Sequence, residues 1–426
     1  MKMIKSVACA LLLLTAAVSV PASGMTPPAS DMDAPVKPAY YEAQYRAEIR
    51  PDAGTIHVEL QLSGERLPRK IVWQMDPKRY RAIAASESTA GPLDINGHLV
   101  TWRPRGKSAH LSYDYVVNHE RAPGHYDSLL TADWALFRGD NLVPRAKVTA
   151  RRGLESRATL EFVLPADWTA LSAYPGSAKR FRIEDPMRRF DRPAGWMIAG
   201  KLGDRVETIA GVHTIVAAPA GNSTRRQDML AFLNWNLPQL LTILPTFPKR
   251  ILIVSAGDPM WRGGLSGPAS LFMHSDRPLI SENRTSTLLH ELVHVGMGIR
   301  GDAESDWIVE GFAEFYSIET LRRSGGISEK RYQAAMRKLD RWGERAPNLL
   351  VAQSSGAVTA RAVMTLKAAD EEIRKLSDGR ASLDDVARDL ANQHEEVSLG
   401  LLQTLAAKHA GQPLKSLERG KLTGSG

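Results

Sequence analysis

The chain has 426 residues, of which 43% are hydrophobic and 24% are charged, and its formal net charge is +8. The length exceeds that of one ordinary domain, so two or three domains are expected, and the composition is typical of a globular protein with a real core. The mild, dispersed positive charge supports anionic partners only weakly. Since no basic cluster is interleaved with aromatic residues, the sequence predicts no nucleic acid partner.

The first residues have the pattern of a secretory signal peptide over residues 1–22. Lys2 and Lys5 form a basic start, residues 6–20 form an apolar run, and small residues precede Ser23. A membrane anchor is the alternative, but the run is short for a span and a proline-rich stretch follows it. Cleavage would lower the net charge to +6 and leave no membrane span. We therefore predict a secreted protein.

The only cysteine, Cys9, lies at the start of the apolar run, so the mature chain contains none. A lipid-attachment cysteine would follow that run, and a lipoprotein is therefore not expected. A chain without disulfides or thiols suits the bacterial periplasm. Residues 23–39 contain four prolines and predict a flexible linker.

Residues 40–215 show the alternation of apolar and polar side chains that is typical of half-buried strands. It is clearest at residues 56–62, 111–117 and 160–164. The number of such segments predicts an N-terminal β-sandwich domain. The histidines of this region are scattered without ligand spacing and are interpreted as strand or loop residues; they are His57, His98, His110, His119, His125 and His213.

After residue 216 the pattern becomes mixed and then helical. The apolar run at 251–254 predicts a buried strand, and the glycines of 261–274 predict a turn and an exposed strand. Residues 285–297 predict a helix that ends at Gly298. A second helix is expected from an N-cap at Asp306 to Gly325-Gly326. Farther on, residues 382–385 fit a variant of the capping box that opens a late helix.

The central motif is His290-Glu291-Leu292-Val293-His294 on the first of these helices. Residues four apart share a helix face, so both imidazoles can reach one zinc ion at about 2.0–2.1 Å. Glu291 is rotated from His290 by about 100°, which places its carboxylate beside the zinc-bound water rather than on the metal. Such a carboxylate can take the proton of that water.

The third zinc ligand is expected on the second helix, at Glu310. This glutamate lies in the otherwise apolar segment WIVEGFAEFYS, 307–317, and a lone buried carboxylate is costly unless it is paired or binds a metal. Fifteen residues separate it from His294, which is enough for a turn and a return on an adjacent helix. Glu314, one turn beyond, is either a surface charge or a partner that orients a ligand histidine; we favour the second role.

Other possible ligand sets fit the sequence less well. The metzincin pattern requires Gly at 297 and His at 300, and the chain has Met297 and Arg300 instead. Asp302 and Glu304 are also possible ligands, but they occupy a short polar connection that favours solvated side chains.

HELVH followed by EGFAEFYS resembles the gluzincin zinc metallopeptidases, including the aminopeptidase N family and thermolysin. The likeness is greatest to the glycyl aminopeptidase family and covers most of residues 40–420. Four further segments resemble parts of that family: LLTADWALFRGDNLVPR, RGGLSGPAS, ASLDDVARDL and AGQPLKSLERG. The resemblance implies an α+β multidomain fold with a β domain (40–215), a thermolysin-like zinc catalytic domain (216–326) and a helical domain (327–426). It also implies that Gly263, Gly264 and Leu265 bind the substrate backbone.

Three features differ from these relatives. The gap between HELVH and EGFAE is shorter than in the aminopeptidase N family by about three residues. Ser266 and Gly267 stand where an acidic residue and a histidine usually follow Gly-Gly-Leu, so no carboxylate is evident for a free amino group. Thr359 stands at the position of a tyrosine that stabilises the oxyanion; Tyr316 and Tyr332 are candidates, but a core or surface role is expected for each.

We therefore predict a secreted, zinc-dependent peptidase that acts on peptides or proteins, with an aminopeptidase activity expected first. Two alternatives stay open: the same zinc site in an endopeptidase, and a zinc-bearing peptide-binding protein without activity. The sequence does not determine the oligomeric state.

Overall fold

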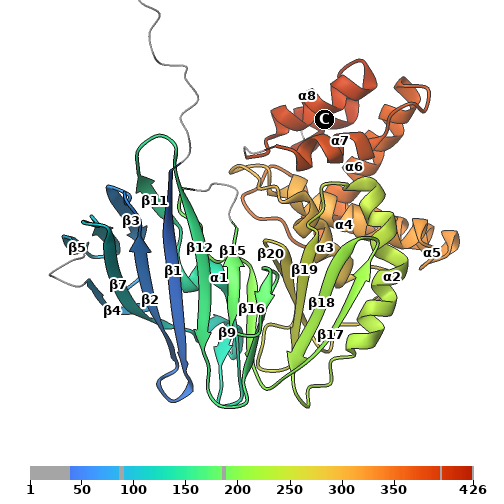
Figure 1. Ribbon diagram of the computed structural model, residues 1–426. Coiled ribbons are helices and arrows are strands. Elements are labelled where there is room, and N and C mark those ends of the chain that lie inside the picture. The colour runs from blue at the N-terminus through green and yellow to red at the C-terminus, as the bar shows by residue number, and fades with distance from the viewer. Residues whose placement is uncertain (1–38, 86–90, 185–188, 394–395, 425–426) are drawn as a thin grey trace, which may run out of the picture. The chain divides into compact units, whose positions relative to one another are not determined.

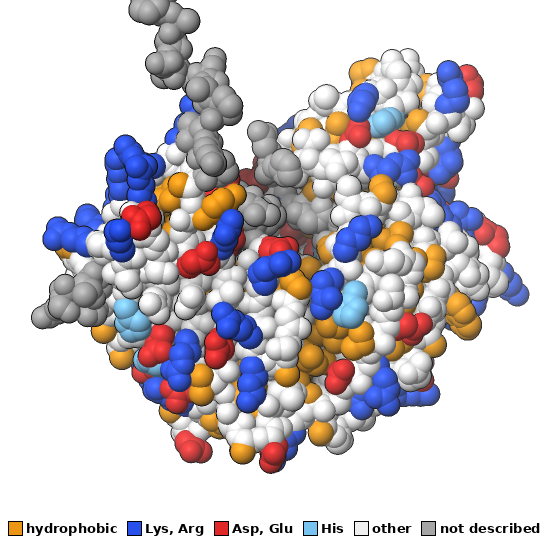
Figure 2. All heavy atoms as spheres, in the orientation of Figure 1, with side chains coloured by type: hydrophobic (Ala, Val, Ile, Leu, Met, Phe, Trp, Pro, Cys, Tyr) orange, Lys and Arg blue, Asp and Glu red, His pale blue; other side chains and the backbone are white. Residues whose placement is uncertain are grey.

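The computed structural model of the chain describes residues 39–85, 91–184, 189–393 and 396–424. The predicted signal peptide and residues 23–38 of the predicted linker lie outside this part. Within it, no helix is both long enough and apolar enough to cross a membrane. On the face drawn in Figure 2, basic and acidic side chains are interspersed, as the dispersed charge of the sequence predicts.

Two sheets of the N-terminal region share one hydrophobic core. The first has the strand order β14 (Gly176–Ser177), β15 (Arg180–Ile183), β12 (Leu154–Val163), β1 (Ala39–Arg50), β2 (Thr55–Ser63), β7 (Ser108–Val116) and β4 (Tyr80–Ala85). The second has the order β11 (Ala146–Thr149), β3 (Lys70–Gln74), β6 (Leu99–Trp102) and β5 (Leu93–Asn96). The predicted alternation is confirmed in β2, where Ile56, Val58, Leu60 and Leu62 are buried.

Two five-stranded sheets follow. One has the order β13 (Thr169–Ser172), β16 (Trp196–Gly200), β10 (Trp134–Arg138), β9 (His125–Leu130) and β8 (His119–Ala122). The other, the mixed sheet, has the order β17 (Leu202–Ile209), β18 (Val212–Pro219), β19 (Arg250–Ala256), β21 (Ser270–His274) and β20 (Gly264–Gly267). The buried strand predicted at 251–254 is confirmed as part of β19.

The three inner strands of the mixed sheet, β18, β19 and β21, are buried on both faces. Leu252 and Val254 of β19 pack in a cluster with Leu136 of β10 and Ile198 of β16, whereas Ile253 packs in the cluster that includes the helices. A strand covered on both faces needs apolar side chains at successive positions, which explains the unbroken apolar run.

The described helices lie almost entirely in the second half of the chain (Figure 1). They are α1 (Gly139–Leu142), α2 (Arg226–Ile243), α3 (Thr287–Met297), α4 (Asp306–Arg323), α5 (Glu329–Gly343), α6 (Ala357–Leu376), α7 (Leu383–Ala391), α8 (Leu399–Ala410) and α9 (Arg419–Leu422). Short 3₁₀ helices occupy Pro51–Ala53 and Lys415–Leu417.

The predicted boundary between residues 215 and 216 falls within β18, which pairs with β17 on one side and β19 on the other. Residues 202–219 therefore belong to the same sheet as residues 250–274. By contacts, residues 38–426 form one compact unit. The division into β, catalytic and helical domains stays a prediction.

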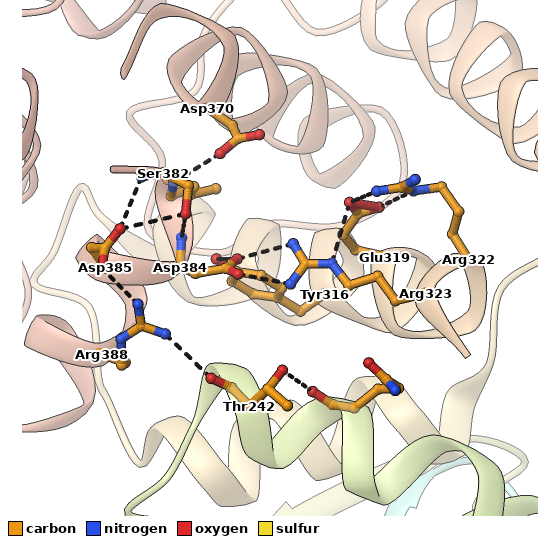
Figure 3. Close-up of polar contacts among 12 residues, drawn as sticks. Thr242, Tyr316, Glu319, Arg322, Arg323, Asp370, Ser382, Asp384, Asp385 and Arg388 are labelled. Atoms are coloured by element: carbon orange, nitrogen blue, oxygen red, sulfur yellow. Dashed lines mark hydrogen bonds and ion pairs between the residues drawn. The ribbon is translucent and has the colours of Figure 1, made fainter. Parts of the chain in front are cut away.

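Partly buried polar contacts join α7 to α4 (Figure 3). Arg323 of α4 donates hydrogen bonds to both carboxylate oxygens of Asp384 on α7, at 2.7 and 3.0 Å, and the hydroxyl of Tyr316 donates to the same carboxylate at 3.1 Å. The predicted capping box at the start of α7 is confirmed, with Ser382 and Asp385 exchanging hydrogen bonds. These contacts fix the helix that carries Glu310.

Candidate metal centre

The helix α3 is stabilised by capping interactions at both ends and by the burial of its apolar side chains. The Ser286 hydroxyl accepts a hydrogen bond from the backbone N–H of Leu289 at 3.3 Å, and Gly298 ends the helix in a left-handed conformation with φ of 60°. Its apolar side chains Leu288, Leu289, Leu292 and Val293 are fully buried. The predicted helix and its stop at Gly298 are confirmed, and the side chains of His290 and His294 remain partly exposed.

The helix α4 lies beside α3 and brings Glu310 to the two histidines. The Ser317 hydroxyl donates a hydrogen bond to the carbonyl of Ser286 at 3.1 Å, which ties α4 to the start of α3. Gly311 packs against α6, where a Cβ atom would lie 2.9 Å from the Cβ of Ala362. The close approach of α4 and α6 thus requires a glycine directly after Glu310.

The predicted N-cap of α4 is displaced by one residue. Ser305 is the N-cap and makes no side-chain capping bond, whereas Asp306 is the first helical residue. A carboxylate in the first turn stabilises a helix start, because it interacts with the positive end of the helix dipole. Asp306 therefore correctly indicated where the helix begins, but it occupies the first helical position and not the N-cap. The Asp306 carboxylate also accepts a hydrogen bond from the backbone N–H of Ser354 at 2.6 Å.

The three predicted ligands converge at one point. The Nε2 atoms of His290 and His294 are 3.1 Å apart, and the Glu310 carboxylate oxygens lie 3.3 Å from the first and 3.4 Å from the second. Ligands at about 2.0–2.1 Å from a tetrahedral zinc ion are separated by about 3.3 Å. The spacing and the donor types therefore fit a divalent ion such as Zn²⁺, and the three side chains form a cluster that could hold a metal.

Charge is concentrated at this cluster. Burial alone lowers the pKa of His290, but its hydrogen bonds to Glu310 and Glu314 raise that pKa to about 10. Burial alone raises the pKa of Glu310, but hydrogen bonds to His290 and His294 hold it well below its usual range. In the metal-free protein a proton on the His290 imidazole thus compensates the negative charge of the carboxylates, as a bound cation would.

Glu314 lies where the orienting role predicts. Its carboxylate contacts the Nδ1 atom of His290 at 3.0 Å, and its side chain is 17% exposed. A bond at Nδ1 leaves Nε2 of the same ring directed toward His294 and Glu310. This arrangement matches the carboxylate–histidine pairs that orient metal ligands.

Glu291 lies against β20, beside this set of donors. A Cβ atom at Gly264 would lie 2.6 Å from both Cγ and Oε1 of Glu291, so the glycine backbone and the glutamate side chain are in direct contact. Burial raises the pKa of Glu291, although the two imidazoles and a hydrogen bond with Ser266 act in the opposite direction. The Ser266 side chain therefore contacts the carboxylate predicted to act as the base.

A cleft of about 740 Å³ opens above the cluster. Among its lining residues are Gly264, Leu265 and Ser266 of β20, the four residues His290, Glu291, His294 and Glu310, and three arginines, Arg121, Arg138 and Arg300. Arg121 and Arg138 were missed by sequence reasoning. They precede the motif by more than 150 residues. Arg138 belongs to the segment LLTADWALFRGDNLVPR, but nothing in the local sequence indicates that either arginine reaches the cleft.

Other candidates lie elsewhere. Glu304 pairs with Arg419 at 2.9 Å, and Asp302 accepts a hydrogen bond from the backbone N–H of Glu304 at 3.0 Å. As expected, Tyr316 and Tyr332 belong to the buried core. Thr359 and Gly263 are not among the residues that line the cleft, and no tyrosine lines it in the described part of the chain.

Comparison of the sequence finds no matching family model and no matching curated protein. Comparison of the fold finds similar solved structures. An aminopeptidase N family protein from Idiomarina loihiensis has a TM-score of 0.62 and 15% identity, covering 82% of this chain and 70% of its own. A mutant M1 zinc metallopeptidase from Deinococcus radiodurans, bound to a Tyr-Ser-Ala substrate, has a TM-score of 0.59 and 16% identity, covering 91% and 94%.

A two-domain M1 zinc metallopeptidase mutant bound to L-arginine is similar to the same degree, with a TM-score of 0.59 and 16% identity over 92% of this chain and 94% of its own. At these identities the likeness shows a common fold. The chain thus has the multidomain α+β fold of M1 zinc metallopeptidases, and the predicted resemblance to the aminopeptidase N family is confirmed at this level. The closer likeness to the glycyl aminopeptidase family stays a prediction.

Proposed function

We propose that the protein is a zinc-dependent peptidase whose metal is held by His290, His294 and Glu310. The observation that carries the proposal is the near-tetrahedral spacing of three donor atoms next to a buried glutamate, within a fold that known zinc metallopeptidases share. Zn²⁺ at this position would polarise a substrate carbonyl and lower the pKa of a water molecule toward neutrality.

The chain itself supplies the proton transfer. Glu291 takes a proton from the attacking water and returns it to the amine that leaves. Its buried position supports this role, because burial raises the pKa of the carboxylate and makes it a stronger base than an exposed glutamate. Glu314 keeps the His290 ring in the orientation that directs Nε2 to the metal position.

The strand β20 is suited to hold the substrate backbone. It lies at the edge of the described sheet, and Gly263 accepts a hydrogen bond from the N–H of His274 on its inner side. Because antiparallel pairing alternates, the N–H and C=O groups of Gly264 face the outer side. A peptide could pair there as an added strand, next to Glu291.

The mode of cleavage has two candidates. Aminopeptidase activity is supported by the neighbours, one of which binds an amino acid. Endopeptidase activity is favoured by the cleft itself, because its only acidic lining residues in the described chain are Glu291 and Glu310, and neither is free to bind an amino terminus. Rates on otherwise identical peptides with free and acetylated amino termini separate the two modes.

Several finer features belong to the same proposal. We propose that the signal peptide predicted at residues 1–22 exports the protein to the periplasm. We also propose that the chain divides into a β-sandwich domain, a thermolysin-like domain and a helical domain. The apolar run after Lys5 and the lack of cysteine in the mature chain support export.

The third candidate function, a peptide-binding protein without activity, is supported by the cleft lining, which in the described chain includes no tyrosine to stabilise an oxyanion.

The test is a screen of a peptide library with metal-loaded protein, with and without a chelator. We expect hydrolysis that the chelator abolishes and added Zn²⁺ restores. Glu291→Gln should abolish hydrolysis and keep the metal. Cleavage by Glu291→Gln at the wild-type rate would exclude the proposed base, and binding without any cleavage would identify the inactive alternative.

A further inference from the structure

The cleft above the metal-binding cluster has an uneven distribution of charge. Its acidic side chains in the described chain are Glu291, which contacts Gly264, and Glu310, which contacts His290 and His294. Apart from the two histidines of the metal-binding cluster, the other charged side chains of the lining are three arginines, and no lysine is among them. Outside the metal-binding cluster and its neighbour Glu291, the charge of the cleft lining is therefore positive.

Arg138, one of the three arginines, already has partners within the protein. The Nε atom of Arg138 forms an ion pair with Asp140 at 2.8 Å, and its Nη1 atom donates a hydrogen bond to the carbonyl of Ser266 at 3.1 Å. This arginine therefore fixes the outer edge of β20 at Ser266, and its charge is offset by Asp140.

The other two arginines keep their charge available. Arg121 of β8 lies over the ring of Trp261, with Cζ 5.2 Å from the ring centroid, and is exposed. Arg300 follows the end of α3 and is exposed, while its backbone carbonyl accepts a hydrogen bond from the N–H of Val397 at 2.7 Å. Among the described residues, neither side chain forms an ion pair.

These two positions have different surroundings. Trp261 stacks with Arg121 and also contacts Gly263, where a Cβ atom would lie 2.4 Å from the indole Nε1, so Arg121 is held near the start of β20. Arg300 follows Gly298 at the end of α3 and also lines the cleft. A peptide bound in this cleft would thus meet two guanidinium groups, one from β8 and one from the segment after α3.

We propose that this cleft selects peptides that carry a carboxylate close to the bond that is cleaved, and that Arg121 and Arg300 bind it. The inference rests on the proposed peptidase function. Guanidinium groups bind carboxylates through paired, charge-assisted hydrogen bonds, and such bonds are strong where the site is partly shielded from water. The carboxylate belongs either to a glutamate or aspartate side chain or to the carboxyl terminus of a short peptide.

The test measures binding, so that it does not depend on turnover. Zinc-loaded Glu291→Gln protein is titrated with alanine-based tetrapeptides that contain one glutamate, glutamine or lysine at the same position. Each peptide is prepared with a free carboxyl terminus and with an amide, which separates the two sources of the carboxylate. The same series is repeated after Arg121→Gln, after Arg300→Gln and, as a control, after Arg66→Gln, which changes an exposed arginine outside the cleft.

We expect a carboxylate, from either source, to tighten binding by about three- to tenfold over the uncharged peptide, and to do so less at high salt. Arg121→Gln or Arg300→Gln should remove this preference, and Arg66→Gln should keep it. Equal binding of all peptides, tightest binding of the lysine peptide, or a preference that survives both cleft substitutions would overturn the proposal. Hydrolysis by the wild-type protein is scored separately, so that a peptidase without this preference is distinguished from a protein without activity.

Discussion

Glu314 and His290 form the contact that orients the candidate metal centre: the carboxylate meets Nδ1 of the ring at 3.0 Å, and Nε2 of the same ring faces Glu310 at 3.3 Å. The His290 ring therefore lies between the carboxylate of Glu314, which orients it, and the carboxylate of Glu310, which is proposed to bind the same metal ion. Two helices, α3 and α4, are sufficient to build this arrangement.

Removal of the orienting carboxylate should weaken metal binding. We expect Glu314→Ala to lower the affinity for Zn²⁺ by about 10- to 100-fold, because the His290 ring loses the bond that fixes its tautomer and direction. Competition with a chromophoric chelator measures the affinity. Glu344→Gln, at an exposed glutamate that ends α5, is the control. An unchanged affinity in Glu314→Ala would mean that the contact has no part in metal binding.

The contact between Gly264 and Glu291 predicts a defect of a different kind. Gly264→Ala should displace the Glu291 carboxylate, because the new Cβ would lie 2.6 Å from its Oε1 atom. We expect kcat to fall by at least about tenfold, with full metal content. Gly420→Ala, where the added Cβ meets no atom within 4 Å, should retain activity. Wild-type kcat in Gly264→Ala would show that the strand and the glutamate are not tightly packed.

The raised pKa of His290 predicts how metal binding depends on pH. In the metal-free protein this pKa is about 10, so the imidazole is protonated at pH 7, whereas a metal ligand must be neutral. Protons therefore compete with the metal, and apparent affinity should rise with pH from 6 to 9, by up to about tenfold per unit. Calorimetry of Zn²⁺ binding in buffers of different ionisation enthalpy should show release of about one proton. Binding heats that do not depend on the buffer would contradict the predicted protonation.

The polar contacts of Figure 3, whose residues do not line the cleft, predict an effect on stability. Asp384→Ala leaves Arg323 without its bidentate partner and Tyr316 without an acceptor, in a partly buried position. We expect the free energy of unfolding to fall by about 2 kcal/mol, as measured by urea denaturation. Glu65→Ala, which breaks the exposed pair with Lys107, should leave the unfolding midpoint unchanged. Equal midpoints for both variants would show that the buried contacts contribute little.

The parts of the molecule that could be predicted are those with a local signal. The helix of the HELVH motif, its end at Gly298 and the capping box at Ser382 follow from residues within one or two turns of each other. The position of Glu310 was predictable because a carboxylate in an apolar helix needs a partner.

The parts that could not be predicted depend on contacts between distant segments. The pairing of β18 with β19 joins residues on both sides of the predicted boundary, and neither strand alone indicates its neighbour. Arg121 and Arg138 reach the cleft only because the sheet of β8 and β10 packs against the mixed sheet. The N-cap of α4 was misplaced by one residue, because Ser305 and Asp306 are both favourable near a helix start.

The most direct test of the central claim is elemental analysis of the purified protein after incubation with Zn²⁺ and removal of excess metal. We expect one zinc ion per chain in the wild type and loss of that ion in the double variant His290→Ala and His294→Ala, with unchanged circular dichroism. Wild-type protein without stoichiometric metal, or a double variant that retains one ion per chain, would contradict the proposed zinc site.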